Sequence, residues 1–172
     1  MNIRKPTHPK EIGEVAELAV ITACRSLGIQ VSVPVGDNAA YDMIIDHSGL
    51  YKCQIKTGRL RDFKIYMPTA RYRLNTKGGY RKPYSKYEVD LFFSYCFENG
   101  NVYVIPNLGW KKEISFRTIP AANNQSVGVY KAELFELQKF IAAHFNKDDI
   151  ERIKAEKHFY GWDSLGNMQD ST

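Results

Sequence analysis

The chain has 172 residues, of which 44% are hydrophobic and 25% charged, so it suits one domain with a sizeable core and does not fit an intrinsically disordered protein. Its net charge of +5 favours polyanionic partners. No apolar run of about 18 residues occurs, and the N-terminal stretch lacks the apolar segment of a signal peptide. Three widely spaced cysteines in apolar contexts, Cys24, Cys53 and Cys96, predict reduced core thiols of a cytoplasmic protein.

The first third of the chain predicts a helix followed by an antiparallel meander. The helix is expected over residues 8–27, because apolar residues recur there at helical spacing, Thr7 suits the N-cap and Gly28 follows the last turn. Three strand-like runs follow at residues 29–35, 41–46 and 50–57. The last two flank a short turn at residues 46–49, which indicates a hairpin.

The remainder of the chain predicts further strands and two helices. Residues 58–87 contain Gly78-Gly79 and Pro83, which indicate a long loop or β-ribbon insertion. Strands are expected at residues 63–67, 89–97, 102–105 and 114–117, and helices at 131–145 and 148–158. The fold class is therefore α/β, with a mixed central sheet flanked by helices. We expect a single domain over residues 1–147 and a C-terminal extension over 148–172 that serves as a subunit contact or a tail.

Polar side chains interrupt the apolar runs at a few positions. Gln54 and Lys56 are two residues apart on one strand and share a face, which Asp42 on the partner strand of the hairpin can reach. Glu17 lies beside the apolar stripe of the first helix, from which it can be aimed at Asp42. Any one of these residues alone is typical of a solvent-facing position, but their grouping favours a shared site. Asp90 interrupts a later strand, where we expect it to hold a buried hydrogen bond.

The four grouped residues have the chemistry of a magnesium site, with Mn²⁺ as a substitute. Mg²⁺ prefers oxygen ligands, which Asp42, the Gln54 amide and the Ile55 backbone carbonyl offer, while Glu17 can bind directly or through water. Lys56 has no free lone pair while protonated, so we expect it to orient or deprotonate an attacking water, or to steady charge on a phosphate. Because a metal lowers the pKa of its bound water, the set predicts phosphodiester hydrolysis.

Residues 56–86 form a strongly basic stretch. Ten basic residues against one acid, Asp62, give it a charge of +9, so the rest of the chain carries −4. Such a stretch is suited to phosphate contacts, and Arg71 and Arg73 would share a strand face from which guanine can be read. The alternative is a solvated loop whose basicity is non-specific. The residues expected to contact DNA are Arg59, Arg61, Lys64, Arg71, Arg73, Lys77, Arg81, Lys82 and Lys86.

The order of these motifs resembles the PD-(D/E)XK nuclease superfamily, and the fuller run resembles its group I intron-associated homing endonucleases. The similar stretches are GEVAE (13–17), PVGDNAAYDMIID (34–46), YKCQIKTGR (51–59) and VDLFFSY (89–95). On this resemblance Glu17, Asp42, Gln54 and Lys56 would form the active site. Gln54 stands where the superfamily usually has an acid, which removes one negative charge and should weaken metal binding.

The resemblance implies a restriction-endonuclease-like core and a magnesium-dependent, sequence-specific endonuclease. Such an enzyme would cut long, nearly palindromic double-stranded DNA as a homodimer or tetramer. Two alternatives stay open. One is another nuclease of the superfamily, such as a Holliday junction resolvase or a restriction enzyme. The other is a DNA-binding protein without catalysis on a nuclease fold, which the amide of Gln54 would suit.

Overall fold

The computed structural model describes residues 3–36, 38–120, 130–144 and 148. The predicted helix at 148–158 and the C-terminal extension therefore lie outside the described residues, apart from Asp148. The helices are α1 (Pro9–Ser26), η1 (Ala132–Phe135, a 3-10 helix) and α2 (Leu137–His144). The strands are β1 (Gln30–Ser32), β2 (Met43–Asp46), β3 (Leu50–Arg61), β4 (Lys64–Pro68), β5 (Ala70–Asn75), β6 (Gly78–Pro83), β7 (Leu91–Cys96), β8 (Asn101–Pro106) and β9 (Glu113–Arg117).

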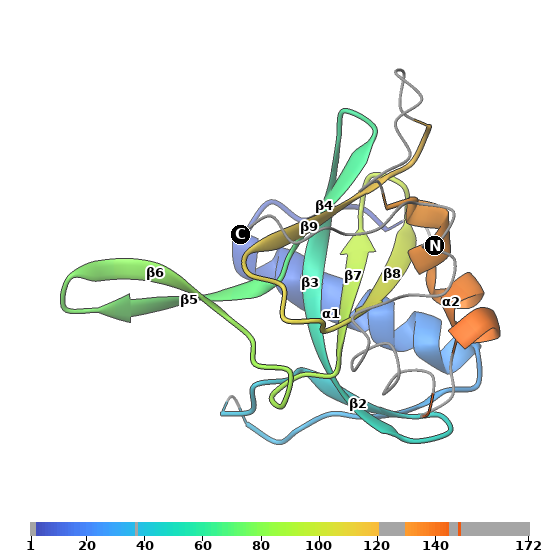
Figure 1. Cartoon of the computed structure of the whole chain (residues 1–172), viewed down its shortest axis with the longest axis horizontal. Helices are drawn as coiled ribbons and strands as arrows, with labels where there is room; N and C mark the ends of the chain where they lie inside the picture. The colour runs from blue at the N-terminus through green and yellow to red at the C-terminus, as the bar shows by residue number, and fades with distance from the viewer. Residues whose placement is uncertain (1–2, 37, 121–129, 145–147, 149–172) are drawn as a thin grey trace.

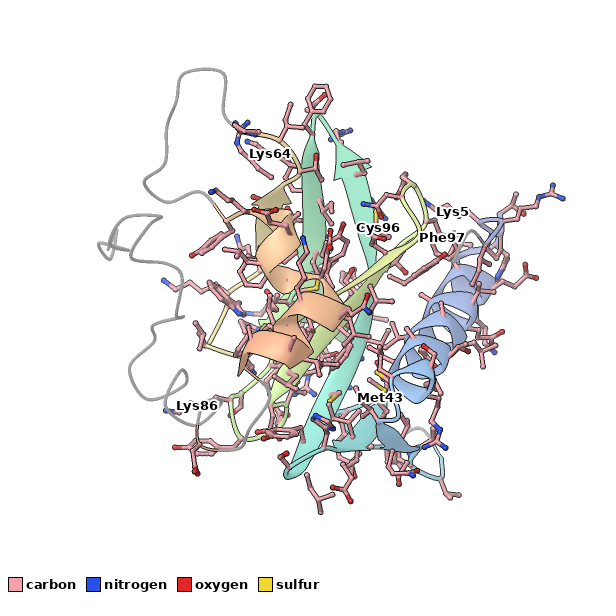
Figure 2. The ribbon with its side chains drawn as sticks, turned by 90° about the vertical axis from the view of Figure 1, so that its right-hand side faces the viewer. Lys5, Met43, Lys64, Lys86, Cys96 and Phe97 are labelled. Atoms are coloured by element: carbon pink, nitrogen blue, oxygen red, sulfur yellow. The ribbon has the colours of Figure 1, made fainter. Side chains whose placement is uncertain are left out.

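Strand β3 organises the main sheet. It pairs antiparallel with β2 and β4 and parallel with β7, which confirms a mixed sheet. The antiparallel neighbours β1, β8 and β9 extend it to seven strands. Helix α1 packs on β3 and β7, whereas α2 packs on β8, and Figure 2 shows the two helices on opposite sides of the sheet. The residues of β7 are all buried, because this strand runs through the middle of the layered core.

The ribbon is the two-stranded sheet formed by β5 and β6, which extends away from the main sheet in Figure 1. The sequence pattern predicts a ribbon or loop anywhere within residues 58–87, and the structure narrows it to residues 70–83. Residues 58–68 instead complete β3 and β4, because Ile65 and Met67 are buried in the core. Every residue of β6 is exposed, so the ribbon is stabilised by its own cross-strand hydrogen bonds and by its root, the point where residues 70 and 83 join the body of the protein.

Three expected boundaries of helices and strands differ from those in the structure. The N-cap position of helix α1 is His8 rather than Thr7, without a side-chain capping hydrogen bond, and Pro9 follows, where the missing backbone N–H breaks no helical bond. Strand β1 covers only residues 30–32 of the predicted 29–35. The expected helix over residues 131–145 breaks at Glu136, which has an extended backbone and bridges to Tyr103 of β8. That bridge depends on a partner far away in the sequence, so the helical pattern does not reveal it.

The three cysteines agree with the prediction of reduced core thiols. Cys24, Cys53 and Cys96 are free and buried. Asp90 accepts a hydrogen bond from the backbone N–H of Lys52 at 2.8 Å, which confirms a structural hydrogen bond, although this bond is exposed and not buried as predicted. Across the described residues, no helix has the length and apolar character needed to cross a membrane.

Candidate active site

One edge of β3 carries a gap between two strand partners. The antiparallel partner β2 reaches Cys53, and β4 begins pairing at Arg59. Alternate residues of a strand direct their backbone groups to the same edge, so Cys53, Ile55 and Arg59 all face this side. Neither β2 nor β4 therefore pairs with Ile55, whose N–H and carbonyl face the gap.

Asp42 lies at the end of this gap that adjoins β2. Its backbone N–H donates to the Cys53 carbonyl at 2.8 Å, which continues the β2 pairing by one step. Its side-chain Oδ2 then accepts the Ile55 N–H at 2.7 Å and also accepts from the Gln54 amide. Gln54 is only 6% exposed, so the solvent-facing alternative is wrong for this residue. The structure thus brings Asp42, Gln54 and the backbone of Ile55 together, as the hairpin register predicts.

Lys56 lies on the same strand face as Gln54 and is half-buried. Its Nζ donates to the hydroxyl of Tyr84 at 3.2 Å and lies 5.3 Å from the centre of that ring. Tyr84 is buried and comes directly after the ribbon. The sequence pattern shows it only as one tyrosine among the basic residues, so its role beside Lys56 depends on how the chain returns from the ribbon.

Glu17 joins the group electrostatically from helix α1. Glu17 is exposed at the surface, yet desolvation raises the pKa of its carboxyl, the negative charge of Asp42 raises this pKa further, and Lys56 lowers it. Burial likewise raises the pKa of Asp42, against the opposing effects of the Ile55 N–H and Lys56. The neighbouring Glu14 is exposed and lies 3.9 Å from Lys10, as expected for a solvated position. The site therefore concentrates negative charge that one lysine only partly offsets.

These shifts predict that Asp42→Asn raises the melting temperature of the metal-free protein near neutral pH. The folded-state pKa of Asp42 lies above its ordinary value of 3.8, so the folded protein keeps this proton to higher pH than the unfolded chain does. Folding stability therefore falls as the pH rises through that window. Asparagine keeps an oxygen for the Ile55 N–H and removes the charge. In thermal unfolding without divalent cations, Asp42→Asn and the wild type should have equal melting temperatures in acid. Toward neutral pH, the melting temperature of the variant should become the higher of the two. Equal stability at every pH would contradict the prediction.

The donor atoms fit a hard divalent cation. The carboxylates of Asp42 and Glu17, the Gln54 amide oxygen and the Ile55 carbonyl are all oxygen ligands, which Mg²⁺ prefers. A half-turn of the Gln54 amide would bring Oε1 to the side of Asp42. No three His, Cys, Asp or Glu side chains cluster for metal binding in the described ranges, so a cation here would depend on the amide and the carbonyl as well.

The basic residues fall into separate groups rather than one patch. Arg59 and Arg61 are exposed on the β3–β4 hairpin. Lys64 and Lys86 lie at opposite ends of the body in Figure 2. The other predicted residues are on the ribbon: Arg71, Arg73, Lys77, Arg81 and Lys82.

The ribbon has a basic face and an apolar face. Directly paired residues share a face, so Arg71 and Arg73 lie with Lys82 and Tyr80. On the opposite side Arg81 accompanies the exposed apolar side chains of Tyr72 and Leu74. The basic face offers Arg73 and Lys82 for phosphate contacts, and the apolar face offers Arg81.

Arg71 is engaged within the protein, which the sequence pattern does not indicate. Its side chain is only 14% exposed and pairs with Glu88. Its guanidinium carbon lies 4.9 Å from the ring centre of Tyr84. The Arg71 hydrogen bond lowers the pKa of Glu88, which also accepts the Ser85 N–H. Arg73 is exposed, so of the two arginines predicted to read guanine it is the one whose side chain is presented to solvent.

Comparisons with known proteins identify the family of this chain. The sequence matches the PD-(D/E)XK endonuclease family over residues 7–138. The structure is similar to that of a bacterial homing endonuclease, I-Ssp6803I, with a TM-score of 0.64 and 22% sequence identity, over 89% of this chain and 100% of that one. No curated protein matches the sequence. Because the family match spans most of the chain, including the whole β3 gap, the chain belongs to the PD-(D/E)XK endonuclease family.

Proposed function

We propose that this endonuclease cuts double-stranded DNA at specific sequences in a magnesium-dependent reaction, as a homing-type enzyme. The observation that carries the proposal is the gap in β3, where the Asp42 carboxylate, the Gln54 amide and the Ile55 backbone meet beside Lys56. PD-(D/E)XK nucleases typically use a divalent metal, and the oxygen ligands here match that requirement.

The residues of the gap divide the work of phosphodiester hydrolysis. A bound Mg²⁺ would supply a Lewis acid that lowers the pKa of a water and offsets charge on the phosphate. Asp42 is held in place by the Ile55 N–H, so its free oxygen keeps a fixed direction. Lys56 is placed to orient or deprotonate the attacking water, or to steady the phosphate charge. Glu17 adds a second carboxylate that holds water at the site.

We propose that the ribbon is the main DNA-binding element. The major groove admits a two-stranded β-ribbon, and the basic face of this one presents Arg73 and Lys82 together with Tyr80. Phosphate contacts fix the register of the protein on the duplex, whereas contacts with base edges set the sequence. An exposed ribbon whose base lies beside the candidate site suits a sequence-specific nuclease. A restriction-type enzyme or a Holliday junction resolvase remains the alternative.

The double variant Arg73→Gln, Lys82→Gln should weaken DNA binding in a salt-dependent way. Each lost phosphate contact lowers the slope of log affinity against log salt by about 0.9, so the pair should lower it by about 1.8. Fluorescence anisotropy with a labelled duplex over a salt series measures this slope. Lys139→Gln is the matched control, because it removes a charge from α2, where Lys139 lies close to Glu133 and Glu136. An unchanged slope in the double variant would show that the ribbon does not contact phosphates.

We also propose that the enzyme acts as a homodimer or tetramer. The support is geometric: the described part of the chain offers one candidate site, and two sites that face opposite strands can break both strands of a duplex together. A symmetric pair of chains supplies them and matches a nearly palindromic target. Sedimentation of the protein with DNA tests the assembly, and a monomer that cuts both strands would contradict it.

The experiment that tests the function is cleavage of a randomised duplex library with Mg²⁺, beside a four-way junction of unrelated sequence. A homing-type enzyme should cut one sequence class in the library and leave the junction intact. Cutting of the junction alone would favour a resolvase. Binding of DNA without any cleavage, with either Mg²⁺ or Mn²⁺, would favour a DNA-binding protein and overturn the proposal.

A further inference from the structure

Tyr84 lies where the ribbon joins the body of the protein. It follows Pro83, the last residue of β6, and is 5% exposed. Its ring packs edge-on against Phe92, with ring centres 5.6 Å apart. Phe92 is the direct partner of Gln54 in the β3–β7 register, so the ring is held beside the candidate site. Burial and the aromatic contact leave Tyr84 with a fixed position.

The hydroxyl of Tyr84 supplies a partner for the Lys56 amine. Lysine has a long flexible stem, and an amine that must act on a water or a phosphate needs to be held in one position. The 3.2 Å hydrogen bond from Nζ to the Tyr84 hydroxyl supplies that restraint, and the ring face 5.3 Å away adds a cation–π contact.

The same ring also receives Arg71 from the outgoing strand of the ribbon. The Arg71 guanidinium lies 4.9 Å from the ring centre and is tied to Glu88. Glu88 in turn accepts the N–H of Ser85, the residue after Tyr84. The buried Asn107 donates to the carbonyls of Ser85 and Val89 and so fixes this turn. Tyr84 therefore follows the last residue of β6 and contacts Arg71 near the start of β5, so it links both strands at the root of the ribbon.

We propose that Tyr84 is a positioning residue that holds Lys56 and, through Arg71, links the ribbon to the cutting site. The Tyr84 ring contacts both Arg71 of the ribbon and the catalytic Lys56, so DNA that binds the ribbon can affect the position of Lys56. Arg71 therefore serves this link rather than base reading. The inference rests on the proposed function, since it assigns a task to Lys56 in DNA cleavage.

The test compares Tyr84→Phe with Tyr87→Phe. The first variant removes one hydroxyl and keeps the ring with its contacts to Phe92 and Arg71. The second removes the same group from a neighbouring tyrosine that is 80% exposed. Single-turnover cleavage is measured at saturating concentrations of a duplex recovered from the library, and the DNA dissociation constant is measured separately. Tyr84→Phe should cut about tenfold more slowly with unchanged DNA affinity and melting temperature, because a small displacement of a catalytic group is costly. Tyr87→Phe should match the wild type.

A second readout does not depend on cleavage. Reductive methylation of the free protein, followed by mass spectrometry of the Lys56 peptide, reports how firmly the amine is held. Tyr84→Phe should speed methylation of Lys56 several-fold relative to Lys139, and Tyr87→Phe should not. Arg71→Met should lower the saturating cleavage rate more than it weakens DNA binding.

The outcomes separate the inference from the function on which it rests. Wild-type cleavage and methylation rates in Tyr84→Phe would overturn the positioning role while leaving the nuclease assignment standing. A wild-type protein that cuts no DNA would overturn the proposed function instead, and the methylation of Lys56 would still decide whether Tyr84 holds this amine.

Discussion

Lys56→Ala should greatly slow DNA cleavage while leaving DNA binding nearly intact. Proton transfer and metal-assisted activation of water each contribute several orders of magnitude, so we expect a loss on the order of 10³-fold in the single-turnover rate. Asp42→Asn should cause a similar loss, because it removes the only charged oxygen that is fixed by the Ile55 N–H. The measurement is cleavage of a library-selected duplex with excess enzyme.

The control for this pair is a lysine of the same strand. Lys52 lies on β3, four residues before Lys56, but is exposed and outside the gap. Lys52→Ala should therefore cut DNA at the wild-type rate. If cleavage survives in both Lys56→Ala and Asp42→Asn, the gap in β3 is not the cutting site, whatever the family of the chain.

Gln54→Glu should lower the stability of the metal-free protein and raise its response to Mg²⁺. The Gln54 amide donates to Asp42, so a carboxylate at this buried position replaces a donor with a like charge. We expect a cost of about 2 kcal/mol near neutral pH, which is typical of an uncompensated charge in a buried network. The cost should vanish in acid, because the protonated carboxyl donates to Asp42 as the amide does.

Magnesium should reverse this cost. A third carboxylate raises the charge of the ligand set, so Mg²⁺ should raise the melting temperature of Gln54→Glu more than that of the wild type. Gln138→Glu is the matched control, since Gln138 is exposed on α2 and should show neither effect. Equal melting temperatures and equal Mg²⁺ responses for Gln54→Glu and the wild type would place position 54 outside the metal site.

The features of this molecule that can be predicted from its sequence are those set by local periodicity. The two-residue spacing of Gln54 and Lys56 places them on one strand face, and the short turn at residues 46–49 fixes the hairpin register that brings Asp42 to Ile55. The apolar runs at residues 89–97 and 102–105 likewise predict two strands, which correspond to β7 and β8. These features depend on neighbours a few residues apart, which a single sequence displays.

The parts that were missed depend on partners far apart in the chain. The break at Glu136 comes from a bridge to Tyr103, and the apolar spacing on either side still resembles one helix. Arg71 looked free to read DNA because Glu88 and Tyr84, which engage it, come later in the sequence. A run of basic residues shows charge but does not show which charges are already paired.

The measurement that tests the central claim most directly is anomalous diffraction from crystals of the protein soaked with Mn²⁺. The account predicts a peak in the gap of β3, bonded to the Asp42 carboxylate and the Ile55 carbonyl, with the Gln54 amide oxygen turned toward it. The peak should disappear in Asp42→Asn crystals soaked in the same way. Mn²⁺ bound elsewhere with the gap left empty, while the same protein cuts DNA, would contradict the assignment of the active site.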